Sequence, residues 1–398
     1  MKGNRQLVPL AFIGMMFFTV GFAMGINSYL VPLLQSTLDV SSGESYLIIA
    51  ATFTAFLVFS YPASKIIARI GYRYTMCLAF GLFAAGFALF IPSAHLRSLP
   101  LFLLASFICG IGNTVLQAAI NPYVTILGPI ESAAKRISMM GICNALSWPV
   151  APLFLAAVIG KDIGDAVLTD IDLPFYIIIG IVLLLGLATC FAPLEEIKAV
   201  GEDEENAADC PYAQGKKSIW QFPHLVLGAL ALFFYVGVET LALSTTVDYA
   251  AALGLKNPQS YAIWPSVGMA VGYVLGIITI PKFISQATAL KICCWMALIG
   301  SLLIVFTPAE TSIWFVASLG LACSLMYPAI WPLAIVDLGR FTKTGSSLLV
   351  ASIGGGALIP LLFGFLKDAV GNHSAYWICL PCYIFIFYYA YSGHKIRK

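Results

Sequence analysis

The sequence predicts an all-α polytopic membrane protein with twelve transmembrane helices arranged as two six-helix pseudo-repeats. Of the 398 residues, 60% are hydrophobic and only 10% are charged, and the mean hydropathy is +0.92. Soluble domains carry about 25% charged residues, so the surplus apolar surface here must face lipid. At about 20 apolar residues for each crossing and about ten for each connection, the chain has room for about twelve spans. The apolar runs do not alternate, which excludes a closed outer-membrane barrel.

Each predicted span is an apolar run between clusters of charged or turn-forming residues. The first six spans are expected at 7–34, 45–68, 73–93, 99–127, 134–160 and 173–193. The second six are expected at 223–250, 259–281, 288–307, 311–338, 344–366 and 373–393. The polar stretch 195–217 contains an acidic run at 202–205. It predicts a flexible cytoplasmic linker between an N-terminal half at 1–194 and a C-terminal half at 218–398.

The charges of the short loops predict the orientation in the membrane. If both termini are cytoplasmic, all but four of the 21 lysines and arginines lie on the cytoplasmic side. Because cationic loops stay on that side, we expect both termini to be cytoplasmic and the protein to reside in the inner (cytoplasmic) membrane. The first apolar run is too long for a signal-peptide core, so it should remain as span 1. The net charge of +2 indicates no surface for nucleic acid.

A short internal repeat supports the division into halves. Residues 17–21 (FFTVG) in span 1 recur as residues 233–237 (FFYVG) in span 7. These are corresponding spans of the two halves. Two parallel six-span halves are typical of transporters that place their binding site at the midplane between the halves.

Amide side chains mark a candidate ligand path, since polar groups in hydrocarbon are costly and usually face a bundle interior or a cavity. Asn113, Gln117 and Asn121 in span 4 are spaced four residues apart and share one helix face. Amides both donate and accept hydrogen bonds, which suits a polyhydroxylated ligand. The alternative is that they join neighbouring helices. Asn27 and Ser28 in span 1 and Asn144 in span 5 extend the polar set.

Two tryptophans near the middle of spans are candidate platforms for the apolar face of a ligand. They are Trp148 in span 5 and Trp331 in span 10. Trp is also the usual residue of the membrane interface, which is the competing interpretation for this residue type.

Glu239 is the carboxylate closest to the middle of a predicted span. A charge at that depth costs about 2.5–3.5 kcal/mol on insertion scales, and no Lys or Arg lies in a predicted span at comparable depth. Burial favours the neutral form, so this carboxyl is expected to take up a proton. We predict that Glu239 binds the coupling cation, H⁺ or Na⁺. The alternative is a protonated carboxyl that bonds across helices.

Charges and glycines at span ends suggest moving parts. Asp337 and Arg340 close span 10 on the predicted cytoplasmic side, where a charge pair can latch a gate or simply end a solvated helix. Residues 354–356 (GGG), followed by Pro360, predict a broken helix in span 11 beside the cavity. No nucleotide-binding, hydrolase or metal motif occurs, and the four histidines lie at span ends. An enzyme and a metal site are therefore not expected.

Several segments resemble one branch of a known family. Residues 121–129 (NPYVTILGP) resemble the N-P-[FY]-V-x-x-L-G-P motif that ends span 4 in the fucose–galactose–glucose symporter branch of the major facilitator superfamily. Similar segments occur at 27–32, 235–239, 327–339 and 342–347, so the resemblance covers nearly the whole chain. It implies the major facilitator fold and cation-coupled transport of a sugar. The superfamily's loop motif between spans 2 and 3 is kept in part, as Arg69-x-Gly71-x-Arg73.

Two positions depart from the pattern of the fucose permeases in that branch. Their span 1 and span 4 segments carry an Asp and a Glu, where this chain has Ser28 and Gln117. A Gln in span 4 together with a Glu in span 7 resembles the transporters of glucose, galactose or N-acetylglucosamine, some of which use sodium. The resemblance therefore implies that Glu239 has taken over the coupling.

These observations predict a secondary active transporter that imports a monosaccharide by symport with H⁺ or Na⁺ through alternating access. The cargo classes are a hexose such as glucose or galactose, fucose, or N-acetylglucosamine. The first alternative is an uncoupled facilitator or a cation-antiporting exporter, and a membrane-embedded enzyme or receptor is the alternative of another class. We expect a functional monomer in the lipid bilayer, with no cofactor beyond the coupling ion.

Overall fold

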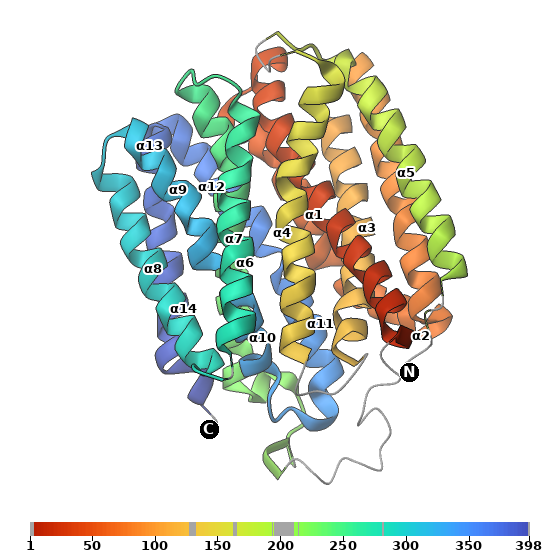
Figure 1. Ribbon diagram of the computed structural model, residues 1–398, viewed down its shortest axis with the longest axis vertical. Helices are drawn as coiled ribbons and strands as arrows, with labels where there is room; N and C mark the ends of the chain where they lie inside the picture. The colour runs from red at the N-terminus through yellow and green to blue at the C-terminus, as the bar shows by residue number, and fades with distance from the viewer. Residues whose placement is uncertain are drawn as a thin grey trace.

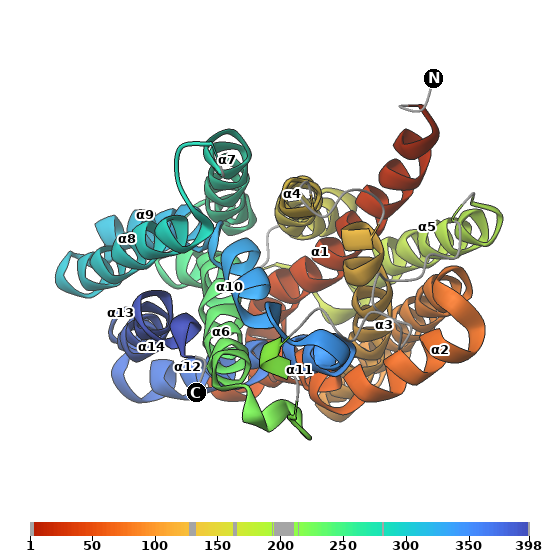
Figure 2. The ribbon, with the colours of Figure 1, turned by 90° about the horizontal axis from the view of Figure 1, so that it is seen from below.

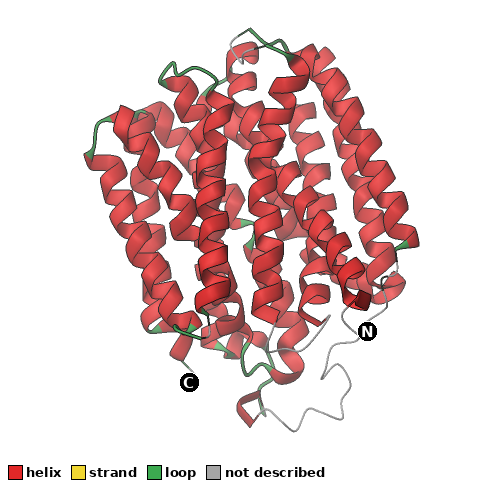
Figure 3. Ribbon diagram, in the orientation of Figure 1, coloured by secondary structure: helices red, strands yellow, loops and turns green. Residues whose placement is uncertain are grey.

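The structure is a computed structural model that describes residues 4–126, 133–161, 165–192, 194, 211–213, 215–280 and 282–396. Within these ranges all regular elements are helices (Figures 1 and 3). The N-terminal helices are α1 (Asn4–Leu38), α2 (Ser42–His95), α3 (Leu99–Ile126), α4 (Ala133–Ile159) and α5 (Asp172–Phe191). The C-terminal helices are α6 (Pro223–Ala252), α7 (Ile263–Thr279), α8 (Gln286–Phe306), α9 (Ala309–Cys323), α10 (Met326–Ile335), α11 (Thr342–Ser352), α12 (Gly355–Val370), α13 (Asn372–Ala375) and α14 (Cys379–Tyr391). Short 3₁₀ helices lie at Leu168–Ile171, Pro211–Ala213, Ile219–Gln221, Pro258–Ala262, Gly339–Phe341, Tyr376–Ile378 and Gly393–Lys395.

The predicted twelve-span fold is confirmed, with one change of boundaries. Eleven helical segments of the described chain are long and apolar enough to cross a membrane. One of them, α2, has 54 residues and carries two predicted spans. A loop was expected between these spans, but the chain instead turns at Gly71, which has φ 77° and ψ 174°. Glycine adopts a positive φ without the Cβ clash of other residues, so the turn needs no separate loop.

The predicted break in span 11 is also present. Helix α11 ends at Ser352, and α12 begins at Gly355. A Cβ at Gly355 would lie 1.8 Å from the carbonyl oxygen of Phe233 on α6, so only glycine permits this approach. Span 10 is interrupted as well, between α9 and α10, which the sequence did not indicate.

The helices form two groups, α1–α5 and α6–α14, which lie side by side when the bundle is viewed along its length (Figure 2). The repeated motif makes the same kind of contact in both groups. A Cβ at Gly21 would lie 2.3 Å from the carbonyl oxygen of Asn144, so α1 packs tightly on α4. A Cβ at Gly237 would lie 2.4 Å from Ile359, so α6 packs tightly on α12. The contact between spans 1 and 5 (α1 and α4) in the first half therefore corresponds to the contact between spans 7 and 11 (α6 and α12) in the second half.

Helix α1 begins and α14 ends at the same end of the bundle (Figure 1). We call this the inner end and the opposite one the outer end, following the predicted orientation. Most of the predicted linker lies outside the described residues, so the division at 195–217 stays a prediction. Leucines of α5 such as Leu184 and Leu187, 67% and 58% exposed, present the apolar surface that a lipid-facing helix requires.

Candidate functional site

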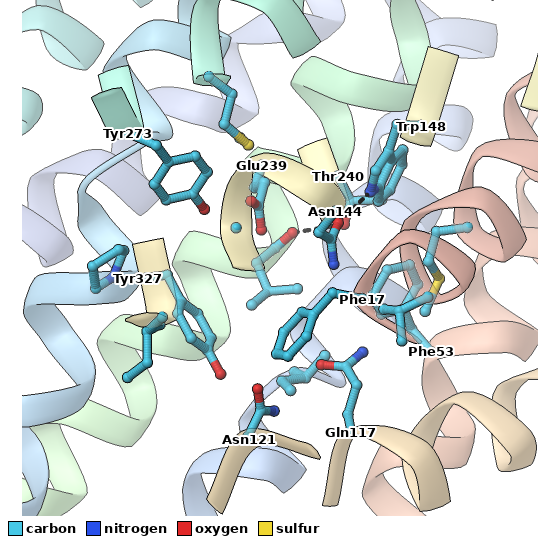
Figure 4. A pocket seen from close by; sticks show the side chains of 18 residues that line it. Phe17, Phe53, Gln117, Asn121, Asn144, Trp148, Glu239, Thr240, Tyr273 and Tyr327 are labelled. Atoms are coloured by element: carbon cyan, nitrogen blue, oxygen red, sulfur yellow. Dashed lines mark hydrogen bonds between the residues drawn. The ribbon is translucent and has the colours of Figure 1, made fainter. Parts of the chain in front are cut away.

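A cavity with an empty volume of about 770 Å³ lies between the two helix groups (Figure 4). The lining residues of the N-terminal group are Phe17, Val20, Met24, Phe53, Gln117, Asn121, Ile137, Gly141, Asn144 and Trp148. Those of the C-terminal group are Val236, Glu239, Thr240, Met269, Tyr273, Tyr327, Pro328 and Ile353. Each group therefore contributes one wall of the same cavity.

Three amide side chains line the N-terminal wall of the cavity. Gln117 and Asn121 come from α3, and Asn144 comes from α4. Gln117 donates from Nε2 to Oδ1 of Asn113 at 2.9 Å. Because Asn113 sits one turn back and is fully buried, it fixes the direction of the Gln117 amide. Of the three amides predicted on this helix face, Gln117 and Asn121 therefore line the cavity, and Asn113 supports Gln117 from behind.

Glycines of α1 determine where Asn144 and Trp148 lie. A Cβ at Gly25 would lie 2.2 Å from the carbonyl oxygen of Trp148, and Gly21 meets Asn144 in the same way. This small-residue face lets α4 approach α1 closely. The indole nitrogen of Trp148 then donates to Oδ1 of Asn144 at 3.1 Å, so the Asn144 Nδ2 group is available to donate into the cavity (Figure 4).

Glu239 lies on the C-terminal wall, and in Figure 4 Gln117 and Asn121 lie at the opposite side of the cavity. The hydroxyl of Tyr235, one helical turn earlier on α6, donates to its Oε1 at 2.7 Å. No ion pair involving Glu239 is found among the residues that the structure describes. A carboxylate with a neutral hydrogen-bond partner inside a membrane protein is suited to binding and releasing a small cation.

Tyr273, Tyr327 and Thr240 are lining residues that the sequence reasoning missed. Tyr273 comes from α7 and Tyr327 from α10, next to the interruption of span 10. Gly141 makes room for the Tyr273 ring, since a Cβ there would lie 2.7 Å from its Cζ. The amides were singled out because a polar group within an apolar run usually faces a cavity or the bundle interior. The hydroxyls of Tyr273 and Tyr327 meet the same criterion, so applying it to tyrosine would have identified both residues.

Besides Asn113, three predicted residues lie outside the lining. Asn27 donates to Oγ1 of Thr52 on α2 at 3.3 Å, so it joins α1 to α2. Trp331 stands behind the wall and stacks on Tyr327, with ring centroids 5.6 Å apart. Ser28 is buried, and no hydrogen bond of its hydroxyl is found within the described part of the chain. A direct contact of these residues with a ligand remains a prediction.

Asp337, one member of the predicted gate pair, is not among the residues that line the cavity. Asp337 is exposed and has a positive φ of 61°, just before the 3₁₀ helix Gly339–Phe341. The side chain of Arg340 falls outside the described part of the structure. The gating role of the pair therefore stays a prediction.

The chemistry of the cavity is that of reversible binding. Its walls offer amide, hydroxyl and aromatic groups and the carboxyl of Glu239. Among the described residues, no group of three or more His, Cys, Asp or Glu could hold a metal ion. A largely apolar cavity with a few polar groups, placed between two membrane-embedded helix groups with related packing, is typical of a transporter of the alternating-access class.

Comparison with known proteins gives the family. The profile of the Major Facilitator Superfamily matches residues 13–350, and the chain belongs to this superfamily. Its members are transporters, so the expectation that the chain is a transporter and not an enzyme is confirmed.

The similarity to individual proteins extends over nearly the whole chain. A glucose/galactose transporter of Brucella abortus biovar 1 (strain 9-941) is 35% identical over 97% of this chain and 94% of its own length. An L-fucose-proton symporter of Escherichia coli (strain K12) is 26% identical over 98% of this chain and 94% of its own length. The crystal structure of an E. coli fucose:proton symporter superposes with a TM-score of 0.72 at 26% identity, covering 97% of this chain and 98% of that one.

Proposed function

We propose that this transporter imports a monosaccharide by symport with a cation. The observation that carries the proposal is the cavity itself, which has amide side chains on the wall of one helix group and the Glu239 carboxyl on the wall of the other. Two relatives that align along almost the full chain are named as a glucose/galactose transporter and an L-fucose-proton symporter, which supports a sugar as cargo.

In this proposal the sugar hydroxyls bond to Gln117, Asn121 and Asn144. Each hydroxyl donates one hydrogen bond and accepts others, and a primary amide offers the complementary groups. The Trp148 ring covers an apolar face of the sugar, and the tyrosine hydroxyls of the opposite wall complete its hydrogen bonds. Because the ligand touches both walls, its binding favours the approach of the two helix groups.

Glu239 carries the coupling ion, H⁺ or Na⁺. In its charged form the carboxylate is costly at this depth, and binding of a cation removes that cost. The empty, charged carrier is therefore hindered from changing conformation, whereas the carrier loaded with ion and sugar is not. Tyr235 donates to one oxygen and leaves the second available to the ion.

The charge asymmetry of the loops supports insertion in the inner (cytoplasmic) membrane with both termini in the cytoplasm. One chain supplies residues to both walls of the cavity, so a single copy is sufficient for binding, and the proposed functional unit is a monomer in the lipid bilayer. A cysteine at either terminus should therefore react with a membrane-impermeant reagent only after the cells are opened.

Uptake into proteoliposomes tests the function. Labelled glucose, galactose, fucose and N-acetylglucosamine are offered with H⁺ and Na⁺ gradients imposed separately and together. We expect accumulation of one sugar under one gradient. Equilibration of the sugar without accumulation would indicate an uncoupled facilitator. Accumulation driven by a cation gradient of the opposite direction would indicate an antiporter. If none of the sugars moved, a monosaccharide would be excluded as the substrate.

Glu239→Gln tests the coupling. The amide keeps the volume but cannot bind a cation by charge, so accumulation should be lost while exchange of sugar across the membrane is kept. Glu310→Gln is the matched control, because Glu310 is an exposed carboxylate in the first turn of α9. Undiminished accumulation by Glu239→Gln would exclude Glu239 as the coupling site.

A further inference from the structure

A second set of polar contacts joins the two helix groups at the outer end, beyond the cavity. Helix α2 begins there at Ser42, α12 ends there at Val370, and Asp248 lies near the end of α6. These contacts involve none of the residues that line the cavity.

The first contact is made by the start of α2. The backbone N–H groups of a helix's first turn have no partner within the helix and need one elsewhere. Ser41 and Glu44 satisfy each other in a capping box. The next two donors are satisfied by the other helix group, since Ser42 N donates to Oδ1 of Asp368 at 3.1 Å and Gly43 N to Oδ2 at 2.7 Å. A carboxylate at a helix N-terminus is also favoured by the helix dipole.

The second contact is buried. The Tyr46 hydroxyl on α2 donates to Oδ2 of Asp248 on α6 at 2.9 Å. Lys367 of α12 holds the same carboxylate, with Nζ 2.9 and 2.7 Å from its two oxygens. The Asp248 and Lys367 side chains are only 4% and 12% exposed. The ion pair lies wholly within the C-terminal group, and Tyr46 reaches it from the N-terminal group.

Small residues let the two groups meet at this place. A Cβ at Gly43 would lie 2.4 Å from the Phe365 ring, and one at Gly364 would lie 3.0 Å from the Cβ of Tyr46. The contact is thus closely packed as well as hydrogen-bonded, and water has little room between the two helices.

We propose that Asp368, Tyr46, Asp248 and Lys367 form an outer latch that holds the outer end of the transporter closed. The inference rests on the proposed function only in that the chain works by alternating access. When the outer end opens, Tyr46 loses Asp248 and the start of α2 loses Asp368, and water takes over these hydrogen bonds. The ion pair of Asp248 with Lys367 stays intact within its own helix group.

This division makes the latch reversible. Breaking a buried ion pair leaves an uncompensated charge, which is a large barrier. Here the contacts that break between the groups involve a hydroxyl and two backbone N–H groups, which water can serve equally well. Lys367 neutralises the charge of Asp248 in both the closed and the open state. The latch therefore favours the closed state without adding a large barrier to opening.

Ser42→Pro removes one latch contact with little other change. Ser42 is the first residue of α2, where proline is well tolerated. The preceding Ser41 has φ −64° and ψ 163°, a conformation that proline favours in the residue before it. Proline lacks the N–H that Asp368 accepts, whereas the control Ser42→Ala keeps it. Tyr46→Phe removes the second contact and keeps the ring.

The distance between spin labels at Val167 and Lys256 reports the opening. Both residues are exposed at the outer end, one on each helix group, and the labels go on cysteines in a variant without the native ones. Each of Ser42→Pro and Tyr46→Phe should raise the ratio of open to closed protein several-fold, and the two together about tenfold, while Ser42→Ala leaves it unchanged.

Two results would overturn the latch. One is an unchanged distance distribution in the double variant, and the other is an equal response to Ser42→Ala and Ser42→Pro. Monodispersity and the melting temperature in detergent check that each variant is folded. The distance needs no added sugar or ion gradient, so it tests the latch even if the proposed cargo or coupling ion is wrong.

Discussion

At the scale of single residues, the neighbours of a polar side chain decide whether it serves packing or binding. Asn27 and Asn144 are both amides within membrane helices. Asn27 bonds to Thr52 of the next helix and is buried, whereas Asn144 faces the cavity and keeps its amide nitrogen available. The same residue type therefore has different surroundings at the two positions.

This difference leads to a prediction about substrate affinity. Asn144→Ala should raise the KM for sugar about tenfold, because a net hydrogen bond to the ligand is lost. Asn27→Ala should leave KM unchanged and lower the melting temperature, since it breaks a contact between helices. Initial uptake rates and thermal unfolding in detergent measure the two effects. A raised KM in Asn27→Ala would instead place that amide in the binding site.

At the scale of elements, close helix approach positions the cavity wall. The glycines of α1 bring its backbone against α4 at Asn144 and Trp148, so two lining residues depend on the absence of side chains on another helix. The interruptions of spans 10 and 11 also lie at the cavity, where Tyr327 and Ile353 line it. Irregular backbone at membrane depth is tolerated when it borders a cavity or is buried in protein.

Gly25→Ala tests this positioning. The new Cβ would lie 2.2 Å from a backbone oxygen, so α1 and α4 must separate, at a cost of about 3 kcal/mol. The melting temperature should fall, and KM should rise because Trp148 moves. Gly81→Ala is the control, since no atom lies within 4 Å of a Cβ there and alanine favours a helix. Equal effects of the two changes would rule out the close-approach argument.

At the scale of the whole molecule, the direction of transport depends on the ion gradient and on which end of the bundle is open. If one positive charge crosses with each sugar, a membrane potential of about 150 mV supplies about 3.5 kcal/mol. That energy corresponds to an accumulation of about 300-fold. The proposed outer latch favours the closed outer end, which limits leakage of ion and sugar through that end.

The stoichiometry can be measured directly. With a potassium diffusion potential of about 150 mV, inside negative, and no chemical gradient of the coupling ion itself, the steady-state ratio of sugar inside to sugar outside should approach about 300. Collapsing the potential should return the ratio to one. A ratio that is insensitive to the potential would mean that no net charge moves with the sugar.

Much of the architecture was predictable because a membrane imposes strong local constraints. Each span must be an apolar run of sufficient length, and loop charges follow a simple rule, so span number and order can be read without long-range contacts. The break at 354–356 was predicted for the same reason, since glycines weaken a helix locally. The sequence analysis placed Gly71 in a loop between two helices. A tight turn at a single glycine has the same local composition as a short loop, so the sequence could not distinguish the two.

The sequence by itself determined that this protein is a membrane transporter built of two related helix groups, and it located the amides and Glu239 that line the cavity. Only the tertiary structure showed that Asn113, Asn27 and Trp331 stand behind or beside that cavity, and that Tyr273 and Tyr327 face it. The outer contacts of Asp368 with the start of α2 likewise became visible only there. The physical reason is that hydropathy depends on each segment alone, whereas the direction of a side chain depends on helix rotation and on contacts between residues as far apart as Ser42 and Asp368.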